Sequence, residues 1–593
     1  MGLLRGEVFK AAASRAIVIK INIAFLIFFL AAYFALLLFQ PSSLLDKNVA
    51  SLVRCTLRDC HLRKVATRGE VPNNAITSEK RMAKEINPPS FLRALGHVGD
   101  AKSIALVNIG NDEVIAWGFD GVEKNKSTAE LTAVNVDFER VHPNFKWADL
   151  FPEWIDEEEE NEGASCPEVP MPDFDSYPGS ADAVVARLPC QRPAKGWNRD
   201  VFRLQVHLVA ANLAVRKGRR DERGRVKVVF LSECEPMPEI FRCDDLTARE
   251  GEWWMYDADA ARLEGKVKLP VGSCELALHL WGEGTNQEFD SSKLAAAAVP
   301  QREAYATVLH SSDAYLCGAI ALAQSIRQTG STRDLILLHD KSINGAKLRA
   351  LVAAGWTPRK IKRIRNPHAE KNSYNEYNYS KFRLWQLTEY DKIIFIDADI
   401  AVFRSLDVLF RFPQIAATGN DGSIFNSGVM VIEPSNCTFD MLIRHRRDVR
   451  SYNGGDQGFL NEIFVWWHRL PRRVNFLKNF WSNTTAETRL KEYLFGADPP
   501  RLYAVHYLGL KPWMCYRDYD CNWNVDDQRV YASDVAHRRW WQLHDGMAEE
   551  LRAFCGLSQK RKDDLEWERT VAKKMAFPDG HWSIDVTDGR KDA

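Results

Sequence analysis

A surplus of charge of either sign is absent from this sequence. Its 593 residues include 79 lysines and arginines and 79 aspartates and glutamates, so the formal net charge is zero. A general nucleic-acid binder normally carries a basic surplus, so the composition argues against that class of protein. Apolar residues make up 46% of the chain and aromatic residues 11%, which is typical of globular domains. The length leaves room for two or three of them.

Zinc-finger spacing is also absent, because no close cysteine pair among the 12 cysteines has a second pair to complete a finger. Close pairs instead fit disulfides formed in an oxidising compartment. The predicted disulfides are Cys55–Cys60, Cys234–Cys243 and Cys515–Cys521. Acceptor sequences for N-glycans occur at Asn125, Asn378, Asn436 and Asn483. We expect no glycan on Asn378, because it lies close to the paired carboxylates described below.

Long apolar runs are absent except for one, at residues 16–39. Between Ile21 and Phe39 the only strongly polar residue is Asn22, and about 20 apolar residues span a bilayer as a helix. A cleaved signal peptide would have a shorter apolar run and a small-residue cleavage site, which is missing after Phe39. Basic residues on the amino side favour a cytoplasmic segment at 1–15. The prediction is a single-pass type II anchor with a lumenal remainder.

Two regions follow the anchor without recognisable chemistry. Residues 40–100 mix basic residues, proline and small polar groups without periodicity, which predicts a stem. Residues 101–296 predict a separate lumenal domain of α/β or α+β class, in which we find no catalytic constellation and whose role is open. Its expected elements are a hairpin at 103–119, a helix at 201–215 and strands at 226–231 and 275–281.

From residue 301 to 556 the pattern changes to alternating β and α units. This alternation predicts an α/β domain with a parallel, doubly wound sheet. The expected strands are 304–310, 334–340 and 360–364, and the expected helices are 314–328 and 347–354. A helical segment at 535–554 is expected to pack on this domain, whereas 557–593 is expected to be a loose, charged C-terminal tail.

The central feature of this domain is the stretch YSKFRLWQLTEYDKIIFIDADI, residues 379–400. A basic and aromatic helix at 380–388 precedes a strand of Ile and Phe at 393–396, which we expect at the centre of a parallel sheet. The strand ends on Asp397 and Asp399, at the edge where open α/β sheets bind ligands. Two carboxylates at this spacing suit a hard divalent cation that also holds a diphosphate. Short acidic pairs also cap strands and helices, so this pattern alone leaves both interpretations open.

Polar residues recur downstream, each with a structural alternative. They are Asn426, Ser427 and Gly428; Asp456 and Gln457; and His506, Gly509 and Lys511. Asn426 could bind a sugar hydroxyl or hold a turn, and Asp456 could reach a reacting sugar or cap a helix. His506 is structural or completes a metal site, with Lys511 close enough in sequence to neutralise phosphate.

In order along the chain, these segments resemble a known family. The pieces DAY, YSK, DAD, FNSGV, GGDQG and HYLG-KPW, between residues 304 and 523, are similar to the glycosyltransferase family that contains glycogenin, galactinol synthase and the plant xylan glucuronosyltransferases. The resemblance is strongest to the plant xylan α-glucuronosyltransferases. It is carried there by YNEYNYSKFRLWQLTEYDKIIFIDAD, NSGVMVIEPSNCTF, SYNGGDQGFLNEIFVWWHRLP and CYRDYDCNWN.

The resemblance implies a GT-A fold and a retaining transfer of glucuronic acid from UDP-glucuronate to xylan, in α-1,2 linkage. It implies Mn²⁺ bound by Asp397, Asp399 and His506. The implied donor-binding residues are Leu309, Tyr315, Lys381, Ala398, Asn426, Ser427, Gly428, Asp456, Gln457, Gly509 and Lys511. Within this set, Leu309 and Tyr315 are expected to flank uridine, and Asp456, Gln457 and Lys381 are expected to act in catalysis.

Two mechanistic questions stay open at this point. Asp456 could act as nucleophile or as stabiliser of an oxocarbenium-like centre, and a front-face route would need no nucleophile from the enzyme. The glucuronate carboxylate needs a cation, for which Arg365, Arg383 and Arg404 are available. Asn453 stands where glycogenin has a second carboxylate, so self-glucosylation is not implied.

The expected function is therefore that of a Golgi membrane enzyme of cell-wall synthesis, with a xylan synthase complex as a candidate partner and no nucleic acid. One alternative is the same fold acting on another UDP-sugar or acceptor, such as an α-glucan primer or a lipid headgroup. The anchor, and the lack of a Ser-rich, acid-poor transit peptide, argue against starch synthesis in plastids. A second alternative is an inactive scaffold, against which the intact Asp397, Asp399 and His506 set argues.

Overall fold

A computed structural model describes nine stretches of the chain, all within one compact unit that begins at Ile86. They are residues 103–117, 132–151, 168–190, 197–269, 271–272, 301–421, 423–479, 485–498 and 500–590. Among these residues, no helix is both long and apolar enough to cross a membrane. The predicted cytoplasmic segment, anchor and stem, and the expected strand at 275–281, lie outside them.

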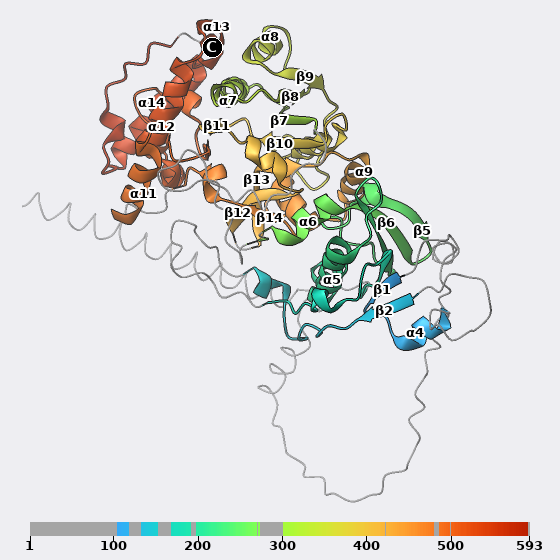
Figure 1. Cartoon of the computed structure of the whole chain (residues 1–593). Coiled ribbons are helices and arrows are strands. Elements are labelled where there is room, and N and C mark those ends of the chain that lie inside the picture. The colour runs from blue at the N-terminus through green and yellow to red at the C-terminus, as the bar shows by residue number, and fades with distance from the viewer. Residues whose placement is uncertain are drawn as a thin grey trace, which may run out of the picture. The chain divides into compact units, whose positions relative to one another are not determined.

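A seven-stranded sheet lies at the centre of the region after residue 301, in the order β14-β12-β13-β10-β7-β8-β9 (Figure 1). Its strands are β7 (Glu303–Leu309), β8 (Asp334–His339), β9 (Thr357–Lys360), β10 (Lys392–Ile396), β12 (Ala416–Asp421), β13 (Ile424–Ile432) and β14 (His468–Leu470). Strands β10, β7, β8 and β9 are parallel. Strand β13 is antiparallel to both β10 and β12, so the sheet is mixed and the prediction of a wholly parallel sheet was wrong. A run of Ile and Phe indicates burial on both faces, but it does not reveal the direction of the neighbouring strand.

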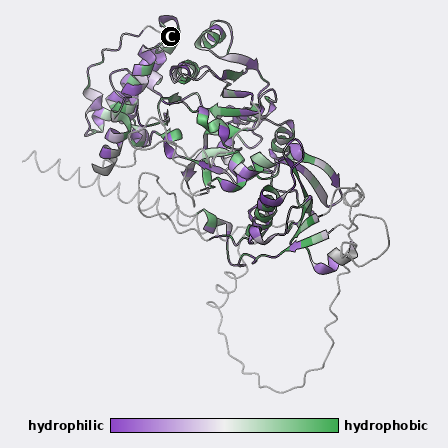
Figure 2. Ribbon diagram, viewed as in Figure 1, coloured by the Kyte–Doolittle hydropathy of each residue, from purple (hydrophilic) through white to green (hydrophobic). Residues whose placement is uncertain are grey.

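Helices cover both faces of this sheet, as an α/β fold requires. Helices α7 (Leu316–Gln328) and α8 (Gly345–Ala354) share one core cluster with Ile394 and Ile396 of β10. On the other side, the 3₁₀ helix η6 (Asn378–Gln386), α9 (Asn436–His445) and α10 (Asp456–Ile463) share a second cluster with Ile393 and Phe395. Successive strand residues point to opposite faces, so β10 contributes to both cores. Figure 2 shows these central strands as mainly hydrophobic.

A small three-stranded sheet, in the order β11-β16-β15, brings a distant segment back to the end of β10. Its strands are β11 (Ile400–Val402), β15 (Phe476–Leu477) and β16 (Ala504–His506). Strand β16 runs antiparallel to β11, with His506 opposite Ile400. Because β11 begins directly after Asp399, this pairing decides where His506 lies.

The region before residue 273 has its own six-stranded sheet, in the order β2-β1-β3-β4-β6-β5. Its strands are β1 (Ser103–Val107), β2 (Thr132–Val136), β3 (Ala183–Arg187), β4 (Arg225–Leu231), β5 (Leu246–Glu250) and β6 (Trp253–Asp259). The predicted helix and strand are confirmed by α5 (Val201–Lys217) and β4. A second, shorter helix, α6 (Ala260–Lys268), follows β6.

The hairpin expected at 103–119 was wrong. Strand β1 is followed by helix α4 (Asn111–Ala116), and β1 pairs in parallel with both β2 and β3. Two acidic residues, Asp112 and Glu113, occupy the first turn of α4, where negative charge favours a helix N-terminus. The Gly-Asn-Asp sequence therefore starts a helix and does not form the tip of a hairpin.

Disulfides connect parts of the chain that are far apart in sequence. The described cysteines form Cys190–Cys234, Cys243–Cys437, Cys317–Cys555 and Cys515–Cys521. The predicted Cys515–Cys521 pair is confirmed, the predicted Cys234–Cys243 pair was wrong, and Cys55–Cys60 lies outside the described residues. Closeness in sequence misled the second prediction because the fold brings each of those cysteines to a distant partner, in one case 194 residues away.

The expectation of a loose C-terminal tail was also wrong. After α12 (Asp534–Asp545) and α13 (Glu549–Arg552), which agree with the expected helical segment, helix α14 (Gln559–Lys574) buries Leu565 and Ala572. Figure 2 shows the C-terminal helices as largely hydrophilic, which explains why their pattern gave no sign of packing. Near the end of the described chain, Arg590 pairs with Asp588 at 2.6 Å and donates hydrogen bonds to three backbone carbonyls.

Candidate active site

The three predicted metal ligands converge at the carboxyl end of β10. Asp397 and Asp399 follow the strand directly, and the β11–β16 pairing places His506 beside them. One ligand atom from each of the three lies within 4.8 Å of the others. His506 Nε2 is 3.3 Å from Asp399 Oδ1, and both side chains are buried. The backbone N–H of Asp397 donates to the carbonyl of Gly428, which fixes the turn after β10.

Two buried lysines reach this cluster from different elements. Lys381, from η6, places its Nζ 2.6 Å from Asp456 Oδ2 and 3.4 Å from Asp397 Oδ1. Lys511 places its Nζ 2.6 Å from the Oδ2 atom of Asp399. The cluster therefore holds three carboxylates and two ammonium groups. These five groups carry one net negative charge, which favours the binding of a further cation.

The pKa shifts lead to the same conclusion. Burial raises the pKa of Asp397 to about 6, and the charge of Asp399 adds to the rise, although Lys381 opposes it. Burial also disfavours the charge of Asp399, but Lys511 and His506 outweigh it and hold the pKa of Asp399 well below its ordinary value. One carboxyl in the pair is therefore strongly ionised and the other is short of compensating positive charge. A divalent cation between them would supply that charge.

Hydrogen bonds of Ser427 and Gln457 connect β13 with Asp456 at the start of α10. The hydroxyl of Ser427 donates to Asp456 Oδ2 over 3.1 Å. The backbone N–H of Ser427 donates to Gln457 Oε1 over 3.1 Å, and Gln457 Nε2 donates to the hydroxyl of Tyr452 over 2.7 Å. Asp456 and Gln457 are the first residues of α10, and the FNSGV and GGDQG segments thus form one hydrogen-bonded unit.

Asn426 is more engaged in structure than its sequence suggests. Its Oδ1 accepts hydrogen bonds from the Gly428 N–H over 2.8 Å and from Asn475 Nδ2 over 2.9 Å. Its Nδ2 donates to Asn420 Oδ1 over 3.1 Å, which leaves one N–H for a ligand. Asn475 is completely buried, and no sequence motif indicated it.

The expected uridine contacts differ from each other in exposure. The side chain of Leu309 is buried in the hydrophobic core, and its backbone carbonyl accepts a hydrogen bond from the Asp340 N–H. Tyr315 is 38% exposed, and Lys511 Nζ lies 5.9 Å from its ring centroid. The structure therefore brings Tyr315 to the lysine side of the cluster and withdraws the side chain of Leu309.

Close packing explains three small residues at the site. A Cβ added to Gly428 would lie 2.7 Å from the His506 ring, and one added to Gly318 would lie 2.2 Å from the carbonyl oxygen of Ala398. Gly509 has a φ of +72°, in the left-handed region that favours glycine. Glycine at these positions therefore allows the backbone segments around the predicted metal ligands to pack closely, independently of any contact with a donor.

None of the arginines considered for the uronate carboxylate contacts Asp397, Asp399 or His506. Arg365 pairs with Glu376 at 2.9 Å, Arg383 donates to Gln386, and Arg404 donates to a backbone carbonyl. Sequence reasoning instead missed His310, at the end of β7. Burial lowers the pKa of His310, and the negative charges of Asp340 and Asp456 oppose that shift.

Both regions of the chain match known protein families. Residues 78–274 match the family model "GUX1-5 N-terminal domain", and residues 306–515 match "Glycosyl transferase family 8". The chain is 55% identical to UDP-glucuronate:xylan alpha-glucuronosyltransferase 2 of Arabidopsis thaliana, over 98% of both proteins. It is 49% identical to UDP-glucuronate:xylan alpha-glucuronosyltransferase 1 of the same plant, over 85% of this chain and 74% of that protein. A solved structure of the galactosyltransferase LgtC with donor and acceptor sugar analogues aligns at 17% identity and a TM-score of 0.28, covering 42% of this chain and 99% of that one.

The chain matches the first of these relatives almost end to end, and the motifs that build the cluster fall within the matched glycosyltransferase segment. The inactive-scaffold alternative loses its basis, because Asp397, Asp399 and His506 are not only present but assembled. The chain therefore belongs to the family of the plant UDP-glucuronate:xylan alpha-glucuronosyltransferases, which confirms the prediction of a UDP-glucuronosyltransferase.

Proposed function

We propose that the protein is a metal-dependent, retaining enzyme that transfers glucuronic acid from UDP-glucuronate to the xylan backbone in α-1,2 linkage. The observation that carries this proposal is the set of a partly exposed Asp397 with the buried Asp399 and His506, which has a lysine on either side. Such a set holds a cation and a diphosphate together. The relatives named above, by their names, use UDP-glucuronate and xylan.

The donor atoms fit Mn²⁺. Two carboxylates and one imidazole suit a borderline divalent ion better than Ca²⁺, which prefers oxygen ligands alone. When bound, the metal would neutralise charge that develops on the diphosphate of the leaving UDP. Lys381 and Lys511 add two fixed positive charges in a buried site, where electrostatic interactions are strong. Their carboxylate partners raise the pKa of both lysines despite burial, so both stay charged at neutral pH.

We assign Asp456 to electrostatic stabilisation of the sugar and not to covalent attack. Its Oδ2 is paired with the Lys381 ammonium at 2.6 Å and accepts from the Ser427 hydroxyl. A carboxylate held in this way is a weak nucleophile, but its remaining oxygen still carries negative charge toward an oxocarbenium-like centre. The front-face route agrees with this arrangement.

A prediction follows for Asp456→Asn, which keeps the shape and removes the charge. We expect kcat to fall about 10²-fold, because one electrostatic contact to the transition state is lost. Intact-mass measurement of the wild type during turnover should show no glucuronosyl adduct. An adduct that disappears in Asp456→Asn would establish Asp456 as the nucleophile.

Gly428→Ala offers a test of the metal site without touching a ligand. The new Cβ would lie 2.7 Å from the His506 ring and 2.8 Å from Asn426 Oδ1, so the ring has to shift from its place beside Asp399. We expect Mn²⁺ affinity to fall about 10- to 100-fold, as for loss of a residue that orients a ligand. Calorimetric Mn²⁺ titration measures this directly. Gly496→Ala, on the surface helix α11 (Thr485–Gly496) with nothing within 4 Å of the new Cβ, is the control.

We further propose that the protein is a single-pass type II protein of the Golgi membrane. The proposed organisation is a cytoplasmic segment at 1–15, an anchor at 16–39, a stem at 40–100, and lumenal domains at 101–296 and 301–556, with a xylan synthase complex as candidate partner. The disulfides among the described residues support an oxidising lumen, because the cytosol keeps thiols reduced. Immunogold labelling with protease protection tests the assignment.

The decisive test of the function is a donor panel. The full-length chain, purified in mild detergent with Mn²⁺, is offered UDP-glucuronate, UDP-glucose, UDP-galactose or UDP-xylose together with xylohexaose. We expect transfer from UDP-glucuronate, with the linkage read by NMR of the product. Transfer from a different UDP-sugar would overturn the donor assignment while leaving the metal site in place.

A further inference from the structure

A groove lined by basic side chains lies on the face of the sheet that carries α9. It has a volume of about 550 Å³ and is formed by the loop after β9, by η6 and by the end of α9. Its basic residues are Lys362, Arg363, Arg365, Arg383, Arg446 and Arg447. No acidic residue lines it. We call this feature the basic groove.

Most of the positive charge in the basic groove is uncompensated. Arg363 pairs with Asp340 at 3.2 Å and Arg365 with Glu376 at 2.9 Å. The other four basic side chains have no carboxylate within ion-pair distance among the described residues. Because the whole chain is neutral, this concentration of one sign is a local feature. Cations held together in a hollow attract an anion of matching shape.

The floor of the basic groove is apolar. Phe439 and Ile443, from α9, line it, and the Arg383 guanidinium lies over the Phe439 ring at 5.3 Å from its centroid. An apolar floor beneath basic walls suits a ligand with apolar ring faces and carboxylate substituents. A sugar chain that carries uronic acids has both properties, whereas a free inorganic anion has only the charge.

The basic groove adjoins the catalytic loops without sharing their charged groups. The Ile364 N–H donates to Ser380 Oγ, next to Lys381. Asn366 Nδ2 donates to the Gly454 carbonyl in the GGDQG segment, over 2.9 Å. The segment between Ile364 and Asn366 is thus hydrogen-bonded both to η6, beside Lys381, and to the residues just before Asp456.

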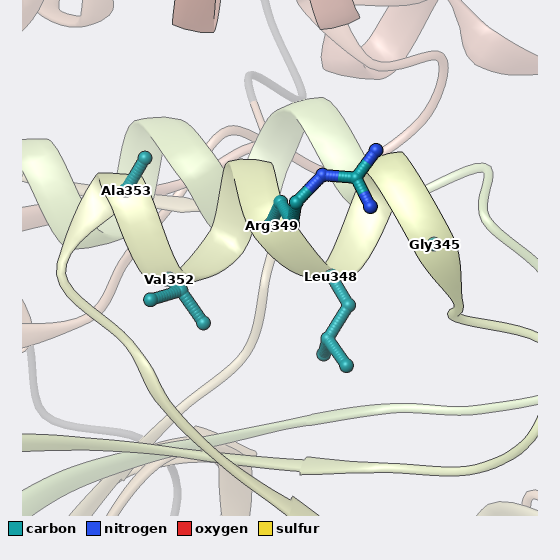
Figure 3. Close-up of a pocket in the computed structure, with 5 residues that line it drawn as sticks. All are labelled: Gly345, Leu348, Arg349, Val352 and Ala353. Atoms are coloured by element: carbon teal, nitrogen blue, oxygen red, sulfur yellow. The ribbon is translucent and has the colours of Figure 1, made fainter.

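A hollow of similar size elsewhere shows that basic lining is not general. A hollow at α8 has a volume of about 510 Å³. Of its lining residues, Leu348 and Val352 point to one side of the helix and Arg349 to the other (Figure 3). Arg349 is the one basic residue that lines it. The basic groove differs in charge, not in volume.

We propose that the basic groove binds uronic acid residues already attached to the polysaccharide, apart from the donor site. This inference rests on the proposed function, which makes an acidic polysaccharide the product. Arginines grip carboxylates through paired hydrogen bonds, and undecorated xylan offers them no charge. The groove therefore lets the enzyme distinguish decorated from undecorated chain and retain the decorated one.

The test compares two triple variants of the full-length chain in detergent. The groove variant is Lys362→Gln, Arg446→Gln, Arg447→Gln. The control variant is Arg349→Gln, Arg538→Gln, Lys560→Gln, which removes the same charge from positions outside the groove. Calorimetry without donor measures binding of a xylo-oligosaccharide bearing two glucuronic acids, of the neutral oligosaccharide of equal length, and of UDP with Mn²⁺.

We expect the wild type and the control variant to prefer the acidic oligosaccharide, and the groove variant to bind it about tenfold more weakly. The preference should also weaken at high salt. UDP affinity and thermal unfolding should be the same in all three proteins. An acidic preference that is absent from the wild type, or retained in the groove variant, would overturn the inference. So would an equal loss of UDP affinity, since the groove would then belong to the donor site.

Failure of the proposed function would appear differently. If the wild type bound acidic oligosaccharide through the groove but transferred no glucuronic acid to xylohexaose, the function would fall and the groove would stand. If transfer occurred and no groove-dependent binding were found, the reverse would hold. Binding and transfer are measured separately, so the result for one does not decide the other.

Discussion

Replacing Asp399 with alanine is expected to reduce kcat for glucuronosyl transfer by about 10³-fold, since several kcal/mol of charge stabilisation depend on the metal site. Asp399 offers one oxygen to His506 at 3.3 Å and the other to Lys511 at 2.6 Å. Its loss removes one of the three proposed metal ligands and leaves the buried Lys511 ammonium without its carboxylate partner. Mn²⁺-dependent UDP binding, measured by calorimetry, should fall with the rate.

Two further variants separate the loss of the carboxylate charge from a general effect of substitution. Asp399→Asn keeps the volume and one acceptor oxygen but removes the charge, so we expect it to lose nearly as much activity as alanine. Asp440→Ala, at an exposed carboxylate on α9, should leave both activity and UDP binding within about twofold of the wild type, as surface changes usually do. A less than tenfold loss in Asp399→Ala would contradict the assignment of the metal site.

Glu433→Gln is expected to lower the free energy of unfolding by about 3–5 kcal/mol, the effect of breaking a buried ion pair from one side. Glu433 follows β13 and is 2% exposed, with the guanidinium groups of Arg242 at 3.0 Å and Arg262 at 3.6 Å. Both arginines belong to the sheet region before residue 273. After the substitution Arg242 keeps Asp244 at 2.8 Å and Arg262 keeps Asp245 at 3.0 Å, but the buried carboxylate that joins the two sheet regions has lost its charge.

A surface pair provides the matched control. Glu389→Gln removes a carboxylate 3.9 Å from Arg359, where both side chains are about half exposed. We expect a change below about 1 kcal/mol there, because solvent screens exposed pairs. Urea unfolding followed by circular dichroism measures both variants. Equal effects of the two substitutions would mean that the buried pair has no special role.

The same pair predicts how stability depends on pH. Burial disfavours the charge of Glu433, but Arg242 and Arg262 outweigh it and hold the pKa of Glu433 well below the ordinary value of 4.5. A pKa depressed by folding contributes stability that is complete above the unfolded value and is lost as pH falls below it. The difference in Tm between wild type and Glu433→Gln should therefore be largest at neutral pH and should shrink below about pH 4.5.

Local patterns were reliable where one element decides its own structure. The buried strand before Asp397, the helix at 201–215 and the alternation of strands and helices after residue 301 were predicted correctly, because apolar periodicity depends only on neighbours in sequence. The direction of β13 and the start of α4 were not predicted correctly. Strand direction depends on where the chain turns, and the first turn of α4 used the same Gly-Asn-Asp residues that close hairpins.

The sequence by itself determined the order and chemistry of the site: an acidic pair after a buried strand, then amide, acid, imidazole and lysine in a sequence that resembles one family. Only the tertiary structure decided which of these groups meet. His506 reaches Asp399 because β16 pairs with β11, and Lys381 reaches Asp456 because η6 and α10 cover the same face of the sheet. The tertiary structure also buries the side chain of Leu309 in the core, and it brings together the three segments that form the basic groove. The distance between residues of different elements depends on how those elements pack. The spacing of residues within one element does not reveal that packing.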